Sequence, residues 1–279
     1  MNSRERILKA IRFQETDRPP IFEKAAEIYK KTIDKFKWDA VLVWRPAIFR
    51  NSAQYEFIPY LKKYLGPDIL VGSFIWNSAI CIETIKDYME FSIALYEEPE
   101  KLHIWAKQML ERAMRHAEKL IDAGCDMIDI PNDYAFNGGP FLTPEQWAEF
   151  TAPYMRTLVN YIKSRGVIVI MHSDGNIMPI LDQIIDIKPH ILQSLDPMAG
   201  MDIAEVKRRT YGKIALMGNV QCNLLQEGPD EEIIKSADYC IRIASPGGGF
   251  IYSSSNTIFK GLPLKNYELM VDYFHKHYE

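Results

Sequence analysis

The sequence predicts an α/β fold, a single (β/α)8 barrel, on three observations. Short apolar runs alternate with amphipathic helical periods, eight such runs occur, and no linker divides the chain. Each run is apolar through most of its length, which is typical of parallel strands covered on both faces. Barrels of this type usually have about 250 residues. We therefore expect residues 1–279 to form one barrel domain with a short N-terminal helical extension.

The eight expected strands are the apolar, β-branched segments that end in polar or glycine-rich residues. In chain order they are Pro20–Glu23, Ala40–Arg45, Ile69–Phe74, Met127–Asp133, Val167–His172, Ile191–Asp196, Ile214–Asn219 and Phe250–Ser254. The same alternation allows a doubly wound open sheet as the alternative. No G-x-G-x-x-G motif follows the first strand, so the dinucleotide-binding version of that fold has no support.

Three helices are predicted most clearly, by apolar positions spaced three and four residues apart. The first covers Glu100–Ala123 and stops at Gly124, a residue type that commonly ends helices. The second begins after Thr143, a predicted N-cap, and its buried face continues to Tyr161. The third covers Pro229–Ala244. Helices in these places would cover the outside of the barrel.

Composition and charge exclude several classes of protein. Hydrophobic residues make up 47% of the chain, enough for a large core, which rules out a disordered or collagen-like protein. The net charge of −4 provides no basic field for nucleic acid or an anionic membrane. We see neither a signal-peptide pattern nor an apolar stretch of the roughly 18 residues that span a membrane. The four cysteines form no disulfide framework, so we expect a cytoplasmic location.

The sharpest chemical signal is the segment His172-Ser-Asp174-Gly-Asn176, at the end of the fifth expected strand. In extended backbone, residues i and i+2 point to the same side, so His172 and Asp174 could bind one metal ion. Imidazole nitrogen and carboxylate oxygen are both zinc ligands. Alternatively, Asp174 or Asn176 caps the helix expected over Ile177–Ile185, and His172 only forms hydrogen bonds in the barrel mouth.

Cys222, which follows the seventh expected strand, is the candidate third metal ligand. A thiolate there would complete a His/Asp/Cys set and leave one position open, as a catalytic zinc requires. The alternative is a half-buried loop cysteine without a metal.

Further polar and aromatic residues follow other strand ends, where barrel enzymes carry their chemistry. Asp133 is a candidate general base or substrate hydrogen-bonding group, although it could instead cap or brace its loop. The hydroxyl and amide groups after the last strand suit a polar or anionic ligand. The candidate substrate-binding residues are Trp44, Trp76, Asn132, Tyr134, Asn219, Ser255 and Asn256.

Several motifs, each weak alone, together resemble the uroporphyrinogen decarboxylase superfamily and run in order over almost the whole chain. They are Ser3-Arg-Glu-Arg-Ile-Leu8, Asp17-Arg-Pro19, Gly124-Cys-Asp126 with Asp133, Thr143-Pro-Glu145, His172-Ser-Asp-Gly-Asn176, Ala199-Gly-Met-Asp202, and Gly247-Gly-Gly-Phe-Ile251 with Ser254-Ser-Asn256. The resemblance implies a (β/α)8 barrel, in agreement with the strand count made from the sequence alone.

Of the two main branches of this superfamily, the chain resembles the zinc-dependent, corrinoid-directed methyltransferases more than the decarboxylases. The decarboxylases resemble one another in an arginine-rich loop near the first strand. The corresponding residues 20–26 contain no arginine here, and Glu23 would repel a substrate that bears many carboxylates. A lyase acting on a carboxylated substrate is therefore kept as the alternative.

The departures from the methyltransferase pattern indicate which methyl donor is used. Thiol-directed members look like His-x-Cys near the fifth strand, with a second Cys near the eighth. Here His172 is followed by Asp174 in place of the first cysteine, and Ser255 stands in place of the second. Carboxylate is a harder ligand than thiolate, and it suits activation of an oxygen substituent. The resemblance thus implies transfer from an O-methyl donor, such as a methoxylated aromatic, to the cobalt of a corrinoid protein.

The resemblance also implies roles for the residues and partners for the chain. Zinc at His172, Asp174 and Cys222 would polarise the ether oxygen, and Asp133 or Glu23 would orient the donor or manage the proton. The aromatic walls of the pocket would be Trp44, Phe74, Trp76 and Tyr134. A corrinoid-binding protein and a small methyl donor are the expected partners, and a homodimer stays open. A barrel that has lost catalysis and only binds the corrinoid protein is a further alternative.

Overall fold

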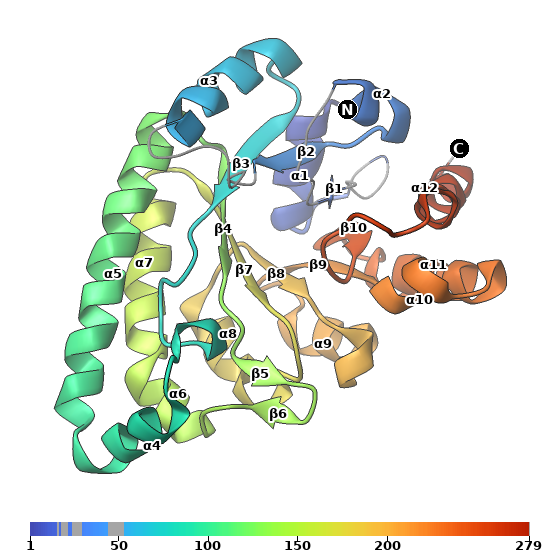
Figure 1. Cartoon of the computed structure of the whole chain (residues 1–279). Helices are drawn as coiled ribbons and strands as arrows, with labels where there is room; N and C mark the ends of the chain where they lie inside the picture. Colours follow the sequence, from blue (N-terminus) through green and yellow to red (C-terminus); the bar gives the residue numbers. More distant parts are fainter. Residues whose placement is uncertain (16, 18–21, 24–29, 44–52, 279) are drawn as a thin grey trace.

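Eight parallel strands form one curled sheet in the part of the chain that the structure describes. This computed structural model describes residues 1–15, 17, 22–23, 30–43 and 53–278. The strand order is β1-β2-β3-β4-β7-β8-β9-β10, and β1 lies beside β10. Helices surround the sheet (Figure 1). The predicted (β/α)8 barrel is therefore confirmed.

Each strand coincides with one predicted run, within a few residues at its ends. The strands of the barrel are β1 (Phe22–Glu23), β2 (Ala40–Val43), β3 (Leu70–Phe74), β4 (Met127–Pro131), β7 (Ile168–Ser173), β8 (Ile191–Ser194), β9 (Ala215–Val220) and β10 (Phe250–Ser254). The predicted ends Pro20, Trp44 and Arg45 lie outside the described residues. Pro131 of β4 lies opposite His172 of β7, which lies opposite Gln193 of β8. This register brings the carboxyl ends of the three strands together.

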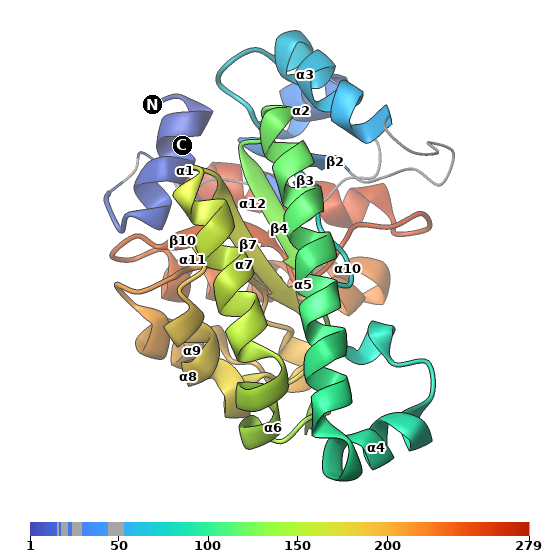
Figure 2. The same cartoon turned by 90° about the vertical axis from the view of Figure 1, so that its left-hand side faces the viewer.

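Helices follow the strands and lie outside the sheet, with α5 and α7 side by side along one flank (Figure 2). The helices are α1 (Ser3–Ile11), α2 (Lys30–Phe36), α3 (Ala53–Leu65), α4 (Tyr88–Glu97), α5 (Pro99–Asp122), α6 (Pro144–Phe150), α7 (Ala152–Ser164), α8 (Leu181–Ile187), α9 (Ile203–Thr210), α10 (Cys222–Glu227), α11 (Asp230–Ala244) and α12 (Leu264–Tyr278). Short 3-10 turns are η1 (Ile82–Thr84), η2 (Met178–Ile180) and η3 (Pro197–Ala199), and β5 (Ala135–Phe136) pairs with β6 (Gly139–Pro140) in a hairpin. None of the described helices is long and apolar enough to cross a membrane.

The helix predicted from Thr143 to Tyr161 is in fact two helices, α6 and α7, which meet at Thr151. Thr143 forms the predicted N-cap, because its hydroxyl accepts the backbone N–H of Gln146 at 3.2 Å. The prediction of one continuous helix was wrong because Pro153, in the first turn of α7, has no N–H to continue the hydrogen-bond ladder of α6.

Helix α1 closes the barrel at the amino ends of its strands. Ile7 and Ala10 of α1 are buried in the same cluster as the side chains that fill the barrel, and the backbone N–H of Gly249, just before β10, donates to Ala10 O. The buried Arg6 donates to the carboxylates of Asp39 and Asp17. A separate, larger apolar cluster lies between the sheet and the outer helices. With the amino end closed, the carboxyl end is the open side.

Candidate metal centre

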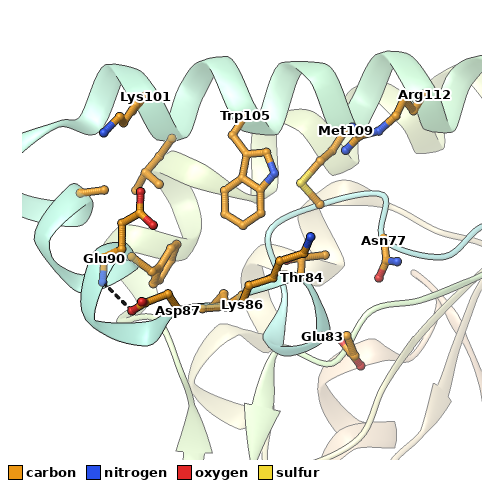
Figure 3. Close-up of a pocket in the computed structure, with 14 residues that line it drawn as sticks. Asn77, Glu83, Thr84, Lys86, Asp87, Glu90, Lys101, Trp105, Met109 and Arg112 are labelled. Atoms are coloured by element: carbon orange, nitrogen blue, oxygen red, sulfur yellow. Dashed lines mark hydrogen bonds between the residues drawn. The ribbon is translucent and has the colours of Figure 1, made fainter.

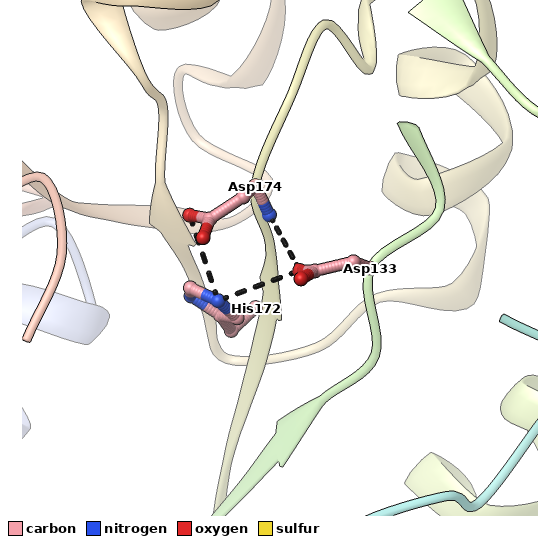
Figure 4. Close-up of side chains that lie close together, drawn as sticks. All are labelled: Asp133, His172 and Asp174. Atoms are coloured by element: carbon pink, nitrogen blue, oxygen red, sulfur yellow. Dashed lines mark hydrogen bonds and ion pairs between the residues drawn. The ribbon is translucent and has the colours of Figure 1, made fainter. Parts of the chain in front are cut away.

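The carboxyl ends of β4 and β7 bring Asp133, His172 and Asp174 together (Figure 4). Each residue offers one ligand atom, and the three atoms lie within 4.8 Å of one another. His172 Nε2 is 3.7 Å from a carboxylate oxygen of each aspartate. One imidazole and two carboxylates form a donor set that zinc accepts, and three protein ligands leave a position for a substrate. The residues present therefore fit a divalent metal ion.

The orientation of His172 is set from behind by Gln193 of β8. His172 Nδ1 is hydrogen-bonded to Gln193 Oε1, and Gln193 Nε2 donates to Ser255 O at 3.3 Å. Because an amide oxygen only accepts, Nδ1 carries a proton, and in the neutral imidazole Nε2 then keeps its lone pair. The lone pair faces the two aspartates, which is the tautomer that a metal ligand needs.

Neutral donors hold the two carboxylates in place. Asp174 accepts hydrogen bonds from Ser194 Oγ at 2.6 Å and from Asn256 Nδ2 at 2.5 Å. Asp133 Oδ1 accepts the backbone N–H of Asp174 at 2.9 Å. Among the described residues, no lysine or arginine pairs with either carboxylate. Their negative charge is thus left for a cation or for the imidazole.

The pKa of Asp133 is raised to about 6, chiefly because the carboxyl is buried. The His172 imidazole works in the opposite direction, while hydrogen bonding with Glu83 and the charge of Asp174 add to the increase. Two neighbouring carboxylates resist being ionised together, and a divalent cation between them would remove that penalty. The protonation of Asp133 is therefore balanced near neutral pH.

Glu83 belongs to this site although the sequence did not indicate it. Both of its carboxylate oxygens lie 3.3 Å from the backbone nitrogen of Asp133, and Asp133 O in turn accepts the N–H of Ile82. Glu83 lies in η1, in the long connection between β3 and α4, where no strand end or motif marks it. Only the fold places this connection beside the end of β4.

Gly175 allows the metal-site loop to pass against the β5–β6 hairpin. Its φ is +79°, and a Cβ at this position would lie 2.2 Å from Ala135 O. The next residue, Asn176, donates its N–H to Phe136 O at 3.0 Å, and its side chain accepts the N–H of Met178 at 3.1 Å. Asn176 thus forms a local side-chain turn, while the N-cap residues of η2 and α8 are Ile177 and Ile180, neither of which caps with its side chain. The predicted cap by Asp174 or Asn176 was therefore wrong, and metal binding by His172 and Asp174 stays a prediction.

Cys222, the predicted third metal ligand, is not part of this group. Its Sγ faces the backbone of Asn256, accepting the N–H at 3.1 Å and lying 3.4 Å from the carbonyl oxygen. The side chain of Asn256 donates to Asp174, so Cys222 supports the site only indirectly, through Asn256. The third ligand atom of the group comes instead from Asp133, for which the sequence predicted a catalytic role.

Several of the predicted substrate-binding side chains are turned into the protein. Asn132 is buried and donates to Ser78 Oγ and to the hydroxyl of Tyr134, which is itself buried. Asn219 donates to Leu195 O, and its amide oxygen accepts from Cys240. These residues brace the walls behind the site, because each satisfies its hydrogen bonds within the core.

Four predicted site residues remain. The structure describes the side chains of Ser255 and Trp76 but not those of Glu23 and Trp44. Ser255 is buried, and its hydroxyl accepts the N–H of Cys222 at 3.2 Å. Trp76 is 42% exposed and stacks on Phe74, which leaves it available to a ligand at the barrel mouth. Glu23 lies at the end of β1, but its side chain is not among those described, and Trp44 lies outside the described residues.

Comparison with known proteins places most of the chain in one family. Residues 48–277 match the family model described as Uroporphyrinogen decarboxylase (URO-D). The uroporphyrinogen decarboxylase of Anaeromyxobacter dehalogenans (strain 2CP-C) is 27% identical over 181 residues, which are 65% of this chain and 49% of that protein. The one from Synechococcus sp. (strain CC9605) is 27% identical over 224 residues, 76% and 60% of the two chains. The chain thus covers less than two thirds of either relative.

Solved structures share the fold. A methyltransferase from Methanosarcina mazei superposes with a TM-score of 0.79 at 16% identity, and all of both chains is covered. A D-tagatose 3-epimerase-like protein gives a TM-score of 0.53 at 10% identity, over 88% of this chain and 92% of that one. At these identities the likeness establishes the barrel, and the chemistry has to be argued from the site.

Proposed function

Because this chain belongs to the uroporphyrinogen decarboxylase family, we propose that it is a metal-dependent methyltransferase of that family. It takes a methyl group from a small O-methyl donor, such as a methoxylated aromatic, and delivers it to the cobalt of a corrinoid carried by a partner protein. The observation that supports this most is the group of Asp133, His172 and Asp174 at the open end of the barrel. Two carboxylates there would repel a substrate rich in carboxylates, which argues against a decarboxylase.

Asp133, His172 and Asp174 would hold the metal, and the metal would supply Lewis-acid polarisation of the donor's ether oxygen. An oxygen-rich ligand set suits such a donor better than a thiol. The protein's own contribution is preorganisation. Gln193 selects the neutral tautomer of His172 in which Nε2 carries the lone pair, while Ser194 and Asn256 fix the oxygens of Asp174.

Asp133 adds a proton-holding group beside the open end of the barrel. With a pKa of about 6, its carboxyl oxygen can carry a proton without a cation and would lose it when a cation binds. Trp76, at the end of β3, offers an aromatic surface that would orient a flat donor and exclude water from it.

The test is a methyl-transfer assay with a reduced corrinoid protein and a panel of methoxylated aromatic compounds, read from the cobalt absorption spectrum. We expect the methylcobalt spectrum to form with the zinc-loaded protein and not with His172→Ala. The matched control is His103→Ala, which removes a half-buried histidine of α5 that contacts Tyr154 rather than the site. Equal rates with His172→Ala and with the wild type would exclude the proposed role of the site.

A second candidate is a carboxy-lyase, favoured by the curated decarboxylases at 27% identity. Release of carbon dioxide from a carboxylated substrate, without any requirement for metal, would support it over methyl transfer. If neither reaction occurs but the corrinoid protein still binds, the barrel serves only as a binding module.

A further inference from the structure

A cavity of about 550 Å³ lies outside the barrel, between α5 and the segment that runs from η1 into α4 (Figure 3). Sites for small molecules usually enclose roughly 300–1,000 Å³, so this volume is more than enough for a ligand of about ten heavy atoms. Glu83 lines the cavity and also contacts Asp133, so the two sites share one wall.

One face of α5 forms an apolar floor for this cavity. Leu102, Trp105, Met109 and Arg112 recur at helical spacing and line it together. Leu102 and Met109 are buried, and the ring of Trp105 lies edge-to-face against Phe91 of α4, with centroids 6.3 Å apart. Figure 3 shows Trp105 and Met109 projecting from α5 into the cavity. The floor therefore offers the half-buried ring of Trp105 to an apolar ligand, over a buried base of Leu102 and Met109.

Of the three cations that line the cavity, Lys101 pairs with Glu98, and Arg112 and Lys86 border this floor. Arg112 lies at the end of the cavity nearest Asn77, and Lys86 reaches toward Trp105 and Met109 from the opposite wall (Figure 3). Neither Arg112 nor Lys86 has a hydrogen bond or ion pair in the structure as described. Guanidinium and ammonium groups beside an apolar surface select an anion that carries an apolar body, because one ligand then satisfies both.

In the described part of the chain, none of the three acidic residues of the lining forms an ion pair with Arg112 or Lys86. Asp87 caps α4 by accepting the N–H groups of Met89 and Glu90 at 2.9 and 3.0 Å. The Glu83 carboxylate accepts the backbone N–H of Asp133 at 3.3 Å. Glu90 lies with Lys101 at the far end of the cavity (Figure 3). The end that holds Arg112 is thus the cationic end.

We propose that this cavity binds a small amphipathic carboxylate, such as an aromatic acid. Its ring lies on Trp105, and its carboxylate lies between Arg112 and Lys86. The site needs no metal, and it stands whether or not the barrel transfers methyl groups.

Calorimetric titration of the full-length, metal-free protein with 4-ethylbenzoate tests this proposal, with 4-ethylbenzamide as the uncharged isostere. We expect saturable one-to-one binding of the acid and at least tenfold weaker binding of the amide. Arg112→Gln should weaken the acid by about tenfold or more, as loss of a charge-assisted hydrogen bond does. Arg115→Gln, on the same helix but outside the lining, should stay within about twofold of the wild type.

A second variant, Lys86→Gln, should weaken the acid in the same way, and Trp105→Leu should weaken acid and amide alike. His172→Ala should change neither affinity, which separates this site from the metal centre. The proposal is overturned if the acid shows no saturable binding, if the amide binds as tightly, or if Arg112→Gln binds the acid like the wild type.

Discussion

Charged side chains are arranged in opposite ways at the two ends of the barrel. At the amino end, the Arg6 guanidinium is surrounded by carboxylates of Asp39 and Asp17, so opposite charges are paired. At the carboxyl end, Asp133 and Asp174 face each other with one imidazole between them, held by neutral donors. The first arrangement stabilises the fold as it stands, whereas the second is costly until a cation arrives. The difference separates a structural end from a functional one.

Asp39→Asn should have the largest effect, because it leaves a buried guanidinium without its buried partner. We expect a loss of about 3 kcal/mol in the free energy of unfolding and, at about 2–4 °C per kcal/mol, a melting temperature lower by roughly 10 °C. Zinc affinity should not change. Thermal and urea unfolding check the first expectation and calorimetry the second. Adding Arg6→Met should recover part of the loss, since no charge is then stranded.

Asp133→Asn should reduce the stabilisation by zinc but not the stability without metal, the reverse of what we expect for Asp39→Asn. Without metal, the variant should be as stable as the wild type or more so, because the crowded carboxylates are relieved. At a zinc concentration one hundred times its dissociation constant, the wild type should gain about 2.7 kcal/mol. The variant should gain less than half of this in the same titration, followed by thermal unfolding with and without zinc. A variant that loses stability without metal would place Asp133 with the structural charges.

Gln193→Met probes whether the carboxyl end depends on its supporting hydrogen bonds. Methionine fills a similar volume but cannot accept from His172 Nδ1, so the ring loses its fixed tautomer. We expect zinc affinity to fall by about 10–100-fold. Stability should also fall, by about 1–3 kcal/mol, because the buried Nδ1–H of His172 and the carbonyl oxygen of Ser255 each lose a partner. Gln193→Glu keeps an acceptor and should retain most of the affinity in the same competition titration.

The pH dependence of stability provides a further test of the comparison, because His190 is a titratable group that lies at the amino end of β8. Burial lowers the pKa of His190 to about 4, and Nδ1 accepts the Val169 N–H at 3.0 Å. The unfolded chain takes up this proton near pH 6.5, so stability is present above that pH and is lost as the pH falls toward 4. We expect about 1 kcal/mol to be lost between pH 7 and 5, after allowance for partial exposure. In urea titrations, His190→Asn, which keeps an acceptor, should remove this dependence.

The strands could be predicted from the sequence because each is a continuous apolar run, and burial on both faces leaves that pattern. His172 and Asp174 were predicted together because extended backbone places i and i+2 on one side. Asp133 could not be assigned as their partner in the same way, since it arrives from another strand. Only the pairing of Pro131 with His172 brings it there.

Two other residues show what residue type alone cannot decide. Cys222 attracted attention as a thiol, yet its sulfur is engaged with the backbone of Asn256. Glu83 went unnoticed because it lies in a connection whose path depends on how α4 and α5 pack. In both cases the deciding contact is with a distant part of the chain, which no local pattern records.

Gly175 has a consequence for how this site could change during evolution. Its neighbours on the β5–β6 hairpin leave no room for a side chain, whatever residue precedes it. This steric limit does not depend on which side chain stands at position 174. Related chains that differ at position 174 should therefore keep this glycine. A search for distant relatives should rely on it more than on the residues of the candidate metal site.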